Sequence, residues 1–435
     1  MARGRRATWV CLLVPPLTLA ALVASAWFRS SGPVRHVDEP AWVASSYYFD
    51  LLRRGDFQHP DWSFMTARDS PPVGKYLFGA ALTVAGHPVR TIEPLAAWQE
   101  RYRSLPGAWG TGRASERRAA VAARLAPDVR SAVARGSYDP FLKGPELTIC
   151  RGVAFAFGVL SALVVAAIGL FLRGPATGLI AGLLYAVHPL VLMASALALF
   201  DIIAVAFSAS AVWCLAALML PGVSLGKAQL PGILGGLFMA LAVGTKMNAL
   251  IVVFLAVVTT ASLALRRDSR RLAFAPVLGV FLGFVLFLGM NPACHMDPLG
   301  ALSDLVVIPK ETTQVQAGFL PDYLPDAPSR WRALGRLAFG HVGLMAVIGV
   351  AAVFLTGLAW RSRGPRIVIV AWFWLAVLLV GHWLPFPWER YALPVVPPAA
   401  LVSADALVGA AGWAWARLHR QDVRQAANTF DARAR

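Results

Sequence analysis

The sequence predicts an all-α polytopic membrane protein with about ten transmembrane helices and a large first extracytoplasmic loop that carries amphipathic surface helices. Of the 435 residues, 57% are hydrophobic and only 14% are charged, whereas charged residues make up about a quarter of an ordinary soluble chain. Uncharged runs long enough to cross a ~30 Å hydrocarbon core recur along the chain, and arginine clusters separate them. The four cysteines form no CxxC pair, so nothing indicates a disulfide scaffold or a zinc or redox motif.

The first transmembrane helix is predicted within residues 1–28. An uncharged run over residues 7–28 follows Arg3, Arg5 and Arg6 and has the length of a membrane span. Residues 24–26 read Ala-Ser-Ala, which resembles a signal-peptide cleavage site, so a cleaved signal peptide is the alternative. Both alternatives place the following segment outside the cytoplasm.

Residues 29–150 are predicted to form the first extracytoplasmic loop, because this polar segment holds 12 of the 23 acidic residues. Within it, residues 40–52 and 74–86 have the pattern of amphipathic helices that lie at a membrane surface. Residues 98–135 are rich in Ala, Arg and Glu, which predicts a soluble helical insertion.

Nine further spans follow the loop. Residues 151–290 contain helices two to seven, residues 291–337 form a second extracytoplasmic loop, residues 338–416 contain helices eight to ten, and residues 417–435 form a cytoplasmic tail. Residues 230–265 could also be one long helix. The nine spans are predicted at 151–172, 175–196, 201–220, 230–245, 247–265, 272–290, 338–359, 366–383 and 391–416.

The basic residues predict the orientation. If ten helices cross the membrane in turn and the N-terminus is cytoplasmic, every basic loop cluster lies on the cytoplasmic side, as the positive-inside rule requires. One helix over 230–265 would invert everything downstream, so charge favours ten helices. The formal net charge of +17 is therefore typical of a membrane protein and does not indicate nucleic-acid binding. The clusters are Arg173, Lys227, Arg266–Arg271, Arg361–Arg366 and Arg417–Arg420.

Charged residues gather at the predicted outer ends of the helices. The pair Asp38-Glu39 follows the first span, and Asp69 precedes the tandem prolines Pro71-Pro72, which favour the start of a helix. Each charge has an ordinary explanation as a solvated loop residue, a helix N-terminal acid or a neighbour of an interfacial aromatic belt. Asp405, inside the last span, is given no role. The other outer charges are Arg68, Lys75, Asp201, Lys246, Glu389 and Arg390.

The ordered set of motifs resembles the C superfamily of membrane glycosyltransferases, in particular the protein O-mannosyltransferase and aminoarabinose-transferase-like branch. The resemblance covers most of the chain except an insertion at about residues 88–148. Its motifs are Asp38-Glu39, Ser45-Ser46-Tyr47-Tyr48, Asp69 to Lys75, Arg151, Asp201, Gly244-Thr245-Lys246, Asn291-Pro292 and Glu389-Arg390-Tyr391-Ala392-Leu393-Pro394.

The resemblance implies transfer of a sugar from a polyprenyl-phosphate lipid to a protein, lipid or cell-envelope glycan acceptor outside the cytoplasm, in a bacterial plasma membrane. It makes Asp38 the catalytic carboxylate, with Glu39 and Asp69 as further catalytic candidates. An attacking hydroxyl needs a base, and a departing phosphate needs cationic or dipolar partners. The binding candidates are Arg68, Lys75, Asp201, Lys246, Glu389 and Arg390.

Two departures from the family pattern bear on the activity. The mannosyltransferase branch has His where Ser70 stands, although Asp69 fits the acidic-x-Pro-Pro form of the aminoarabinose branch. Residues 195–200 contain no cation, whereas the mannosyltransferase pattern has an Arg shortly before the acid at Asp201. Phosphate recognition therefore differs, or the activity has been lost.

Two other function classes stay open. One is a transporter or flippase of a lipid-linked substrate, although no internal repeat is present. The other is a catalytically silent relative that acts as a scaffold. The cofactor is unknown; His36 or His59 with the neighbouring acids could ligate a divalent metal.

Overall fold

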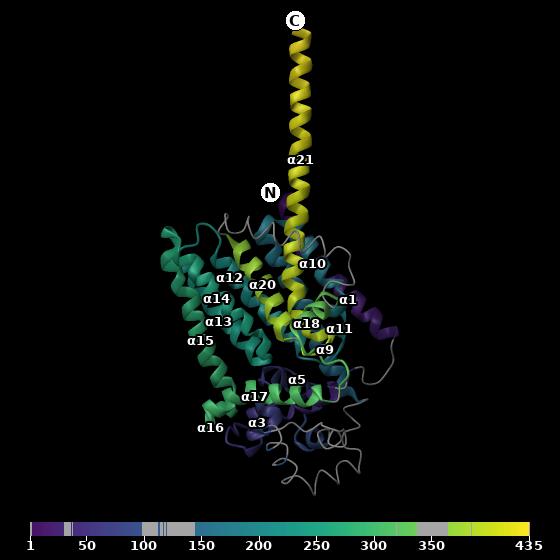
Figure 1. The fold of residues 1–435 in the computed structure, drawn as a ribbon, viewed down its shortest axis with the longest axis vertical. Coiled ribbons are helices and arrows are strands. Elements are labelled where there is room, and N and C mark those ends of the chain that lie inside the picture. The colour runs from purple at the N-terminus through teal and green to yellow at the C-terminus, as the bar shows by residue number, and fades with distance from the viewer. Residues whose placement is uncertain are drawn as a thin grey trace.

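The chain forms a helical bundle with a layer of short helices across one end (Figure 1). The computed structural model describes residues 2–29, 36, 38–97, 112–113, 116, 119, 144–318, 320–336, 364–383 and 385–434, and these contain no strand. Eight of the described helices are long and apolar enough to cross a membrane, and a bent pair makes a ninth. The all-α polytopic class is therefore confirmed. The eight spans contain α1 (Ala2–Arg29), α9 (Pro145–Arg173), α12 (Asp201–Leu218), α13 (Leu225–Thr245), α14 (Ile251–Ala264), α15 (Phe274–Met290), α20 (Pro365–Trp383) and α21 (Val396–Ala434).

The span predicted over 175–196 is bent by 63° into α10 (Pro175–Ala186) and α11 (Pro189–Ala196). Proline has no backbone donor and disfavours helical geometry in the residue before it. His188 is accordingly extended, and its side chain accepts a hydrogen bond from the backbone N–H of Leu190 at 3.2 Å. The His188-Pro189 pair is thus the sequence signal for this break.

The close contact between α13 and α15 establishes that residues 230–265 form two spans. Gly232 contacts Ala275 and Gly236 contacts Gly279, so the residue numbers rise together and the helices are parallel. A methyl group at Gly236 would overlap the carbonyl of Gly279; small residues at i and i+4 allow such close approach in membranes. Because α13 and α15 are parallel, the chain must cross back between them, through η2 (Met247–Leu250) and α14.

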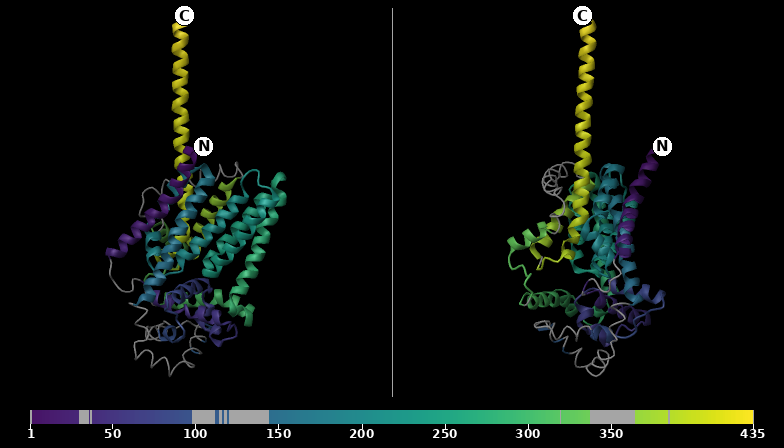
Figure 2. Two further views of the ribbon diagram at one scale, coloured as in Figure 1. Left: turned by 180° about the vertical axis from the view of Figure 1, so that it is seen from behind. Right: turned by 90° about the vertical axis from the view of Figure 1, so that its right-hand side faces the viewer.

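Two sequence predictions need a boundary correction. The span predicted from residue 151 begins at Pro145, where proline suits the first helical turn. The tail predicted over 417–435 continues the last helix to Ala434, because no proline or glycine follows Gly412. This extension projects far beyond the bundle (Figure 2). The predicted span 338–359 and most of the predicted insertion 98–135 lie outside the described residues.

A layer of short helices covers the end of the bundle opposite to the two chain termini (Figures 1 and 2). The amphipathic helix predicted over 74–86 is α5, whereas the one predicted over 40–52 is divided by a turn at Ser45–Ser46. The layer brings both predicted extracytoplasmic loops together, because α4 contacts α17. Its elements include α2 (Glu39–Ala44), α3 (Tyr47–Arg54), η1 (Pro60–Ser63), α4 (Met65–Arg68), α5 (Val73–Val84), α16 (Pro292–Met296) and α17 (Pro298–Ala317). Two further elements, α18 (Ala327–Leu334) and η5 (Glu389–Val395), precede α20 and α21.

Helix α12 is the centre of the bundle, because 89% of its residues are buried inside the protein. It contacts α9, α13, α14 and α20. Its first residue is Asp201, so the packing of the bundle fixes one charged residue at the junction between the membrane helices and the layer of short helices.

Candidate active site

Asp38 and Arg390 form an ion pair although 352 residues separate them. Asp38 is the residue before α2, and Arg390 lies in η5. The backbone N–H of Asp38 donates to Nδ1 of His36 at 3.2 Å. Burial lowers the pKa of this histidine, which keeps the ring neutral and able to accept. The predicted catalytic carboxylate is therefore held beside a cation.

A second ion pair, Lys246 with Asp201, lies beside the first. Lys246 is extended because α13 ends at Thr245, and Asp201 begins α12, where the helix dipole favours a negative charge. The ring of Tyr391 joins the two pairs: Nζ of Lys246 and Cζ of Arg390 lie 5.9 and 5.3 Å from its centroid. Four predicted site residues thus meet around one aromatic ring.

A stack of aromatic rings holds Arg390. Trp388 is stacked on Phe386 at 4.7 Å and on Tyr391 at 5.6 Å, with interplanar angles of 17° and 16°. The guanidinium carbon of Arg390 lies 5.0 Å from the centre of the Trp388 ring, within the range of a cation–π contact. Among the described residues, the buried Nε of Arg390 has no hydrogen-bond partner. This N–H of the guanidinium is therefore left without a protein acceptor in the described structure.

Glu39 is fully buried and occupied on both oxygens. Nε and Nη2 of Arg151 donate to its two oxygens at 2.8 and 2.9 Å, and the backbone N–H of Ala198 donates at 2.8 Å. This bidentate geometry is the strong form of a carboxylate–guanidinium contact. Glu39 thereby joins α2, α9 and the turn before α12. A catalytic role for Glu39 stays a prediction. Its contacts favour a structural role, in which Glu39 holds Asp38 in place relative to Asp201.

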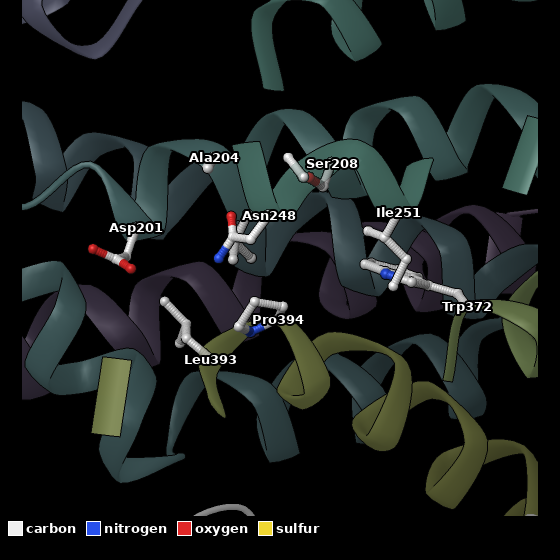
Figure 3. A pocket seen from close by; sticks show the side chains of 10 residues that line it. Asp201, Ala204, Ser208, Asn248, Ile251, Trp372, Leu393 and Pro394 are labelled. Carbon is white, nitrogen blue, oxygen red and sulfur yellow. The ribbon is translucent and has the colours of Figure 1, made fainter. Parts of the chain in front are cut away.

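An apolar groove begins beside Asp201 (Figure 3). Its first part has a cavity volume of about 20 Å³, and a second part of about 10 Å³ shares three wall residues with it. The groove therefore runs from the ion pairs along α14 and α20. The first part is lined by Asp201, Ala204, Val205, Ser208, Asn248, Ala249, Ile251, Trp372, Leu393 and Pro394, and the second adds Ala376, Leu379, Val380, Trp383 and Tyr391.

Arg68 belongs to a different cluster. It is 4% exposed, and its Nη1 donates to Asp297 at 3.1 Å and to Asp304 at 3.0 Å. Asp304 also accepts from Arg113 at 3.2 Å. The cluster joins α4 to α17, and neither acid was a sequence candidate, because nothing in the local sequence pairs them with Arg68.

Lys75 and Asp69 also lie apart from the two central ion pairs. Lys75 is fully buried, and its ammonium donates to the carbonyl oxygens of Thr66 and Ser70, the latter at 2.8 Å. Burial lowers the pKa of Lys75 to about 8, although the nearby Asp69 opposes the shift. Lys75 thus closes the turn around the tandem prolines. The side chain of Glu389 lies outside the described residues.

The missing arginine before Asp201 has a structural counterpart. Phe200 stands there and packs against Trp42 at 4.7 Å and Phe78 at 5.0 Å between ring centroids. This turn is therefore apolar, and the cations beside Asp201 come from Lys246 and Arg390 instead.

The sequence named two histidines as possible metal ligands. Nδ1 of His36 lies 3.9 Å from Asp38, and Nδ1 of His59 lies 3.4 Å from Asp61 rather than near Asp69. In the described part of the chain, no three His, Cys, Asp or Glu side chains are grouped as metal ligands.

Comparisons with known proteins show a similarity in one segment of the sequence and in the fold. Residues 140–282 match the sequence model of the dolichyl-phosphate-mannose-protein mannosyltransferases. No curated protein sequence matches the chain.

Two membrane glycosyltransferases have similar structures. The oligosaccharyltransferase of Archaeoglobus fulgidus in its apo form has a TM-score of 0.55 at 12% identity, over 97% of this chain and 52% of that one. ArnT from Cupriavidus metallidurans in the apo state has a TM-score of 0.50 at 14% identity, over 90% of this chain and 59% of that one. Its structure bound to undecaprenyl phosphate matches at 0.50, with 13% identity and the same coverage. This chain thus spans 52–59% of the length of these neighbours, and the C-superfamily glycosyltransferase resemblance is confirmed.

Proposed function

We propose that this chain, which has the fold of C-superfamily membrane glycosyltransferases, transfers a sugar from a polyprenyl-phosphate carrier to a hydroxyl acceptor. One observation carries the proposal. The carboxylates of Asp38 and Asp201 are each paired with a cation around Tyr391, where an apolar groove begins. A polyprenyl-phosphate sugar needs these parts together: apolar walls for the hydrocarbon, cations for the phosphate and a carboxylate for the acceptor.

Asp38 has the position of the general base. The acceptor hydroxyl attacks the anomeric carbon on the face opposite to the phosphate, and its proton passes to the Asp38 carboxylate. The bond between the anomeric carbon and the phosphate oxygen breaks, so the configuration at this carbon is inverted. A positioned base contributes about 10²–10⁴-fold to such a step.

Arg390 and Lys246 have the position of leaving-group partners. The polyprenyl phosphate departs with a negative charge, which preorganised cations stabilise without further rearrangement. Because Nε of Arg390 has no partner in the described structure, the guanidinium can bind a phosphate oxygen while its Nη1 stays on Asp38. The same residue would thus align base and leaving group.

The orientation of this site follows from the basic loops. The positive-inside rule puts Arg173 and the 266–271 loop in the cytoplasm and the ion pairs outside, in a multi-pass membrane protein that we assign to a bacterial plasma membrane. The sugar is a hexose or pentose unit, and the acceptor is a protein, lipid or cell-envelope glycan.

One observation favours a second function, transport of a lipid-linked substrate. The 63° break between α10 and α11 resembles the discontinuous helices of transporters. A flippase moves the intact lipid and breaks no glycosidic bond, and a silent scaffold neither moves nor cleaves it.

Proteoliposomes that contain the purified full-length chain distinguish these functions. With a radiolabelled polyprenyl-phosphate sugar and a cell-envelope extract as acceptor source, a transferase moves label to the acceptor and releases polyprenyl phosphate. Transbilayer movement of the intact labelled lipid, without release, would instead establish a flippase. For an Asp38→Asn variant in the same assay, Asp322→Asn is the matched control, because it removes an exposed loop carboxylate far from the groove in sequence.

A further inference from the structure

Asn248 is the polar side chain at the point where the two parts of the groove meet. It lines both parts together with Ile251 and Pro394, which are apolar. Figure 3 shows its amide directed into the groove between Asp201 and Pro394. An uncharged polar group therefore stands between the charged end and the hydrocarbon walls.

The local backbone places this amide. Helix α13 ends at Thr245, Lys246 is extended, and η2 follows as a single turn closed by the N–H of Ala249 on the carbonyl of Lys246 at 3.0 Å. Lys246 reaches Asp201, and two residues later Asn248 reaches the groove. The same turn thus presents a cation and an amide to one end of the groove.

The amide of Asn248 has capacity for a ligand. A carboxamide offers two N–H donors and one oxygen acceptor. Among the described residues, no hydrogen bond involves the Asn248 side chain, and the groove walls around it are largely apolar. A polar group in such surroundings gains most from a partner that enters the groove.

We propose that Asn248 binds the phosphate of the lipid carrier by donating an N–H to a non-bridging phosphate oxygen. This inference rests on the proposed function and adds a residue to it. In a polyprenyl-phosphate sugar, the phosphate is the group that joins the polar sugar to the hydrocarbon. Asn248 stands at the corresponding junction of the groove, so the phosphate is the part of the donor that meets its amide. Lys246 and Arg390 supply the charge, and Asn248 supplies a directional donor.

Replacement by aspartate separates phosphate contact from sugar contact. A carboxylate has nearly the same shape as the amide but donates no hydrogen bond and repels a phosphate. A sugar hydroxyl, in contrast, can donate to a carboxylate, so Asn248→Asp would be tolerated or beneficial if the amide met the sugar.

The test measures binding of polyprenyl phosphate and of the uncharged polyprenol of equal length to the full chain by native mass spectrometry. For Asn248→Ala we expect affinity for polyprenyl phosphate to fall about 10-fold, the lower part of the range for a hydrogen bond to a charged group. Asn248→Asp should fall further, and both variants should bind polyprenol as the parent does, which shows that the groove is intact. Gln229→Ala, which removes an exposed carboxamide near the start of α13 that does not line the groove, is the matched control and should bind both lipids normally.

The remaining outcomes overturn the inference. If the parent prefers the phosphate but both Asn248 variants bind it normally, the inference fails while the proposed function stands. If Asn248→Asp binds polyprenyl phosphate as well as or better than Asn248→Ala, the amide does not donate to the phosphate and the inference fails. If the parent itself binds polyprenol and polyprenyl phosphate equally, the proposed function and this inference fail together.

Discussion

Carboxylates pair with cations at both ends of this bundle, but the two clusters differ in what they leave open. The groove cluster consists of Asp38, Asp201, Lys246 and Arg390. The far-end cluster consists of Asp405, which accepts from Arg173 and from Arg366 at 2.8 Å. Helix α9 connects the two ends: Arg151 supports the groove cluster and Arg173 is its last residue, and at 1.5 Å per residue they are roughly 33 Å apart.

The difference lies in the surroundings of the charges. The groove cluster adjoins an apolar groove, contains two acids and two cations, and keeps an unused donor on Arg390. In the far-end cluster, both Asp405 oxygens are taken by arginines from α9 and α20, so the three helices are tied together. A charge inside a membrane protein is a functional candidate, but only the first cluster offers a ligand both space and hydrogen bonds.

The largest expected effect is all-or-none and tests whether the two clusters face opposite sides of the membrane. Reporters fused at Gly174, Asp268 and Gly364 should read as cytoplasmic, and one at Leu324 as external, because the basic loops stay inside. The measurement is the activity of paired reporters that function on one side only. An external signal at Asp268 would contradict the placement of the groove cluster outside.

The next effect concerns Asp38. Asp38→Asn keeps the size of the side chain and removes its basicity, so initial rates at saturating donor should fall about 10²–10⁴-fold while donor binding persists. The matched control is Glu39→Gln, which should reduce the rate less, because Glu39 is occupied by Arg151 and Ala198 and acts through position. The ratio of the two initial rates decides: a near-normal Asp38→Asn rate would remove the base role from this residue.

A feature of these clusters could be predicted from the sequence only where it depends on residues that are near one another along the chain. Apolar length and basic loops predicted the spans, because these properties are local. The four members of the groove cluster were also predicted, each from its place at a helix end. Their pairing was not, because Asp38 and Arg390 lie 352 positions apart in the sequence.

The same limit explains what sequence reasoning missed. Arg68 stays a predicted phosphate ligand, but the sequence did not show that its Nη1 donates to Asp297 and Asp304 from a distant loop. Lys75 is buried on backbone carbonyls that no side-chain pattern reveals. Asn248 belongs to no motif in the sequence, whereas Lys246 does. The backbone at η2 places Lys246 on Asp201 and Asn248 in the wall of the groove. The break at His188-Pro189 could have been predicted from proline alone.

A smaller effect is expected from the cations of the groove cluster. Arg390→Met should raise the donor KM about 10- to 100-fold, because a guanidinium can bind phosphate through two N–H groups. Lys246→Met should raise it less, since an ammonium acts as a point charge. Steady-state kinetics against donor concentration measure both, with the thermal midpoint as a check on folding. If both variants transfer sugar at the parental rate, Arg68 and Lys75 become the alternative phosphate ligands.

The smallest effect on activity, and a large one on stability, should follow a change in the far-end cluster. Asp405→Asn removes the negative charge that two partly exposed arginines share, and breaking a buried ion pair costs up to about 3–5 kcal/mol. The side chains of Arg173 and Arg366 are 31% and 23% exposed, so water compensates them in part and the loss should be below that range. The thermal midpoint of the purified protein should therefore fall by several degrees.

The activity of the folded Asp405→Asn protein should stay within about twofold of the parent. The lost ion pair involves Arg173, which lies roughly 33 Å along α9 from Arg151, so the groove cluster should stay intact. A double-mutant cycle with Arg366→Gln isolates the pair: the two changes should cost less together than the sum of the single changes, since each removes the same contact. A loss of turnover comparable to that of Asp38→Asn, in protein that is still folded at the assay temperature, would mean that the far-end cluster takes part in the reaction cycle. The distinction between a closed structural cluster and an open catalytic one would then be wrong.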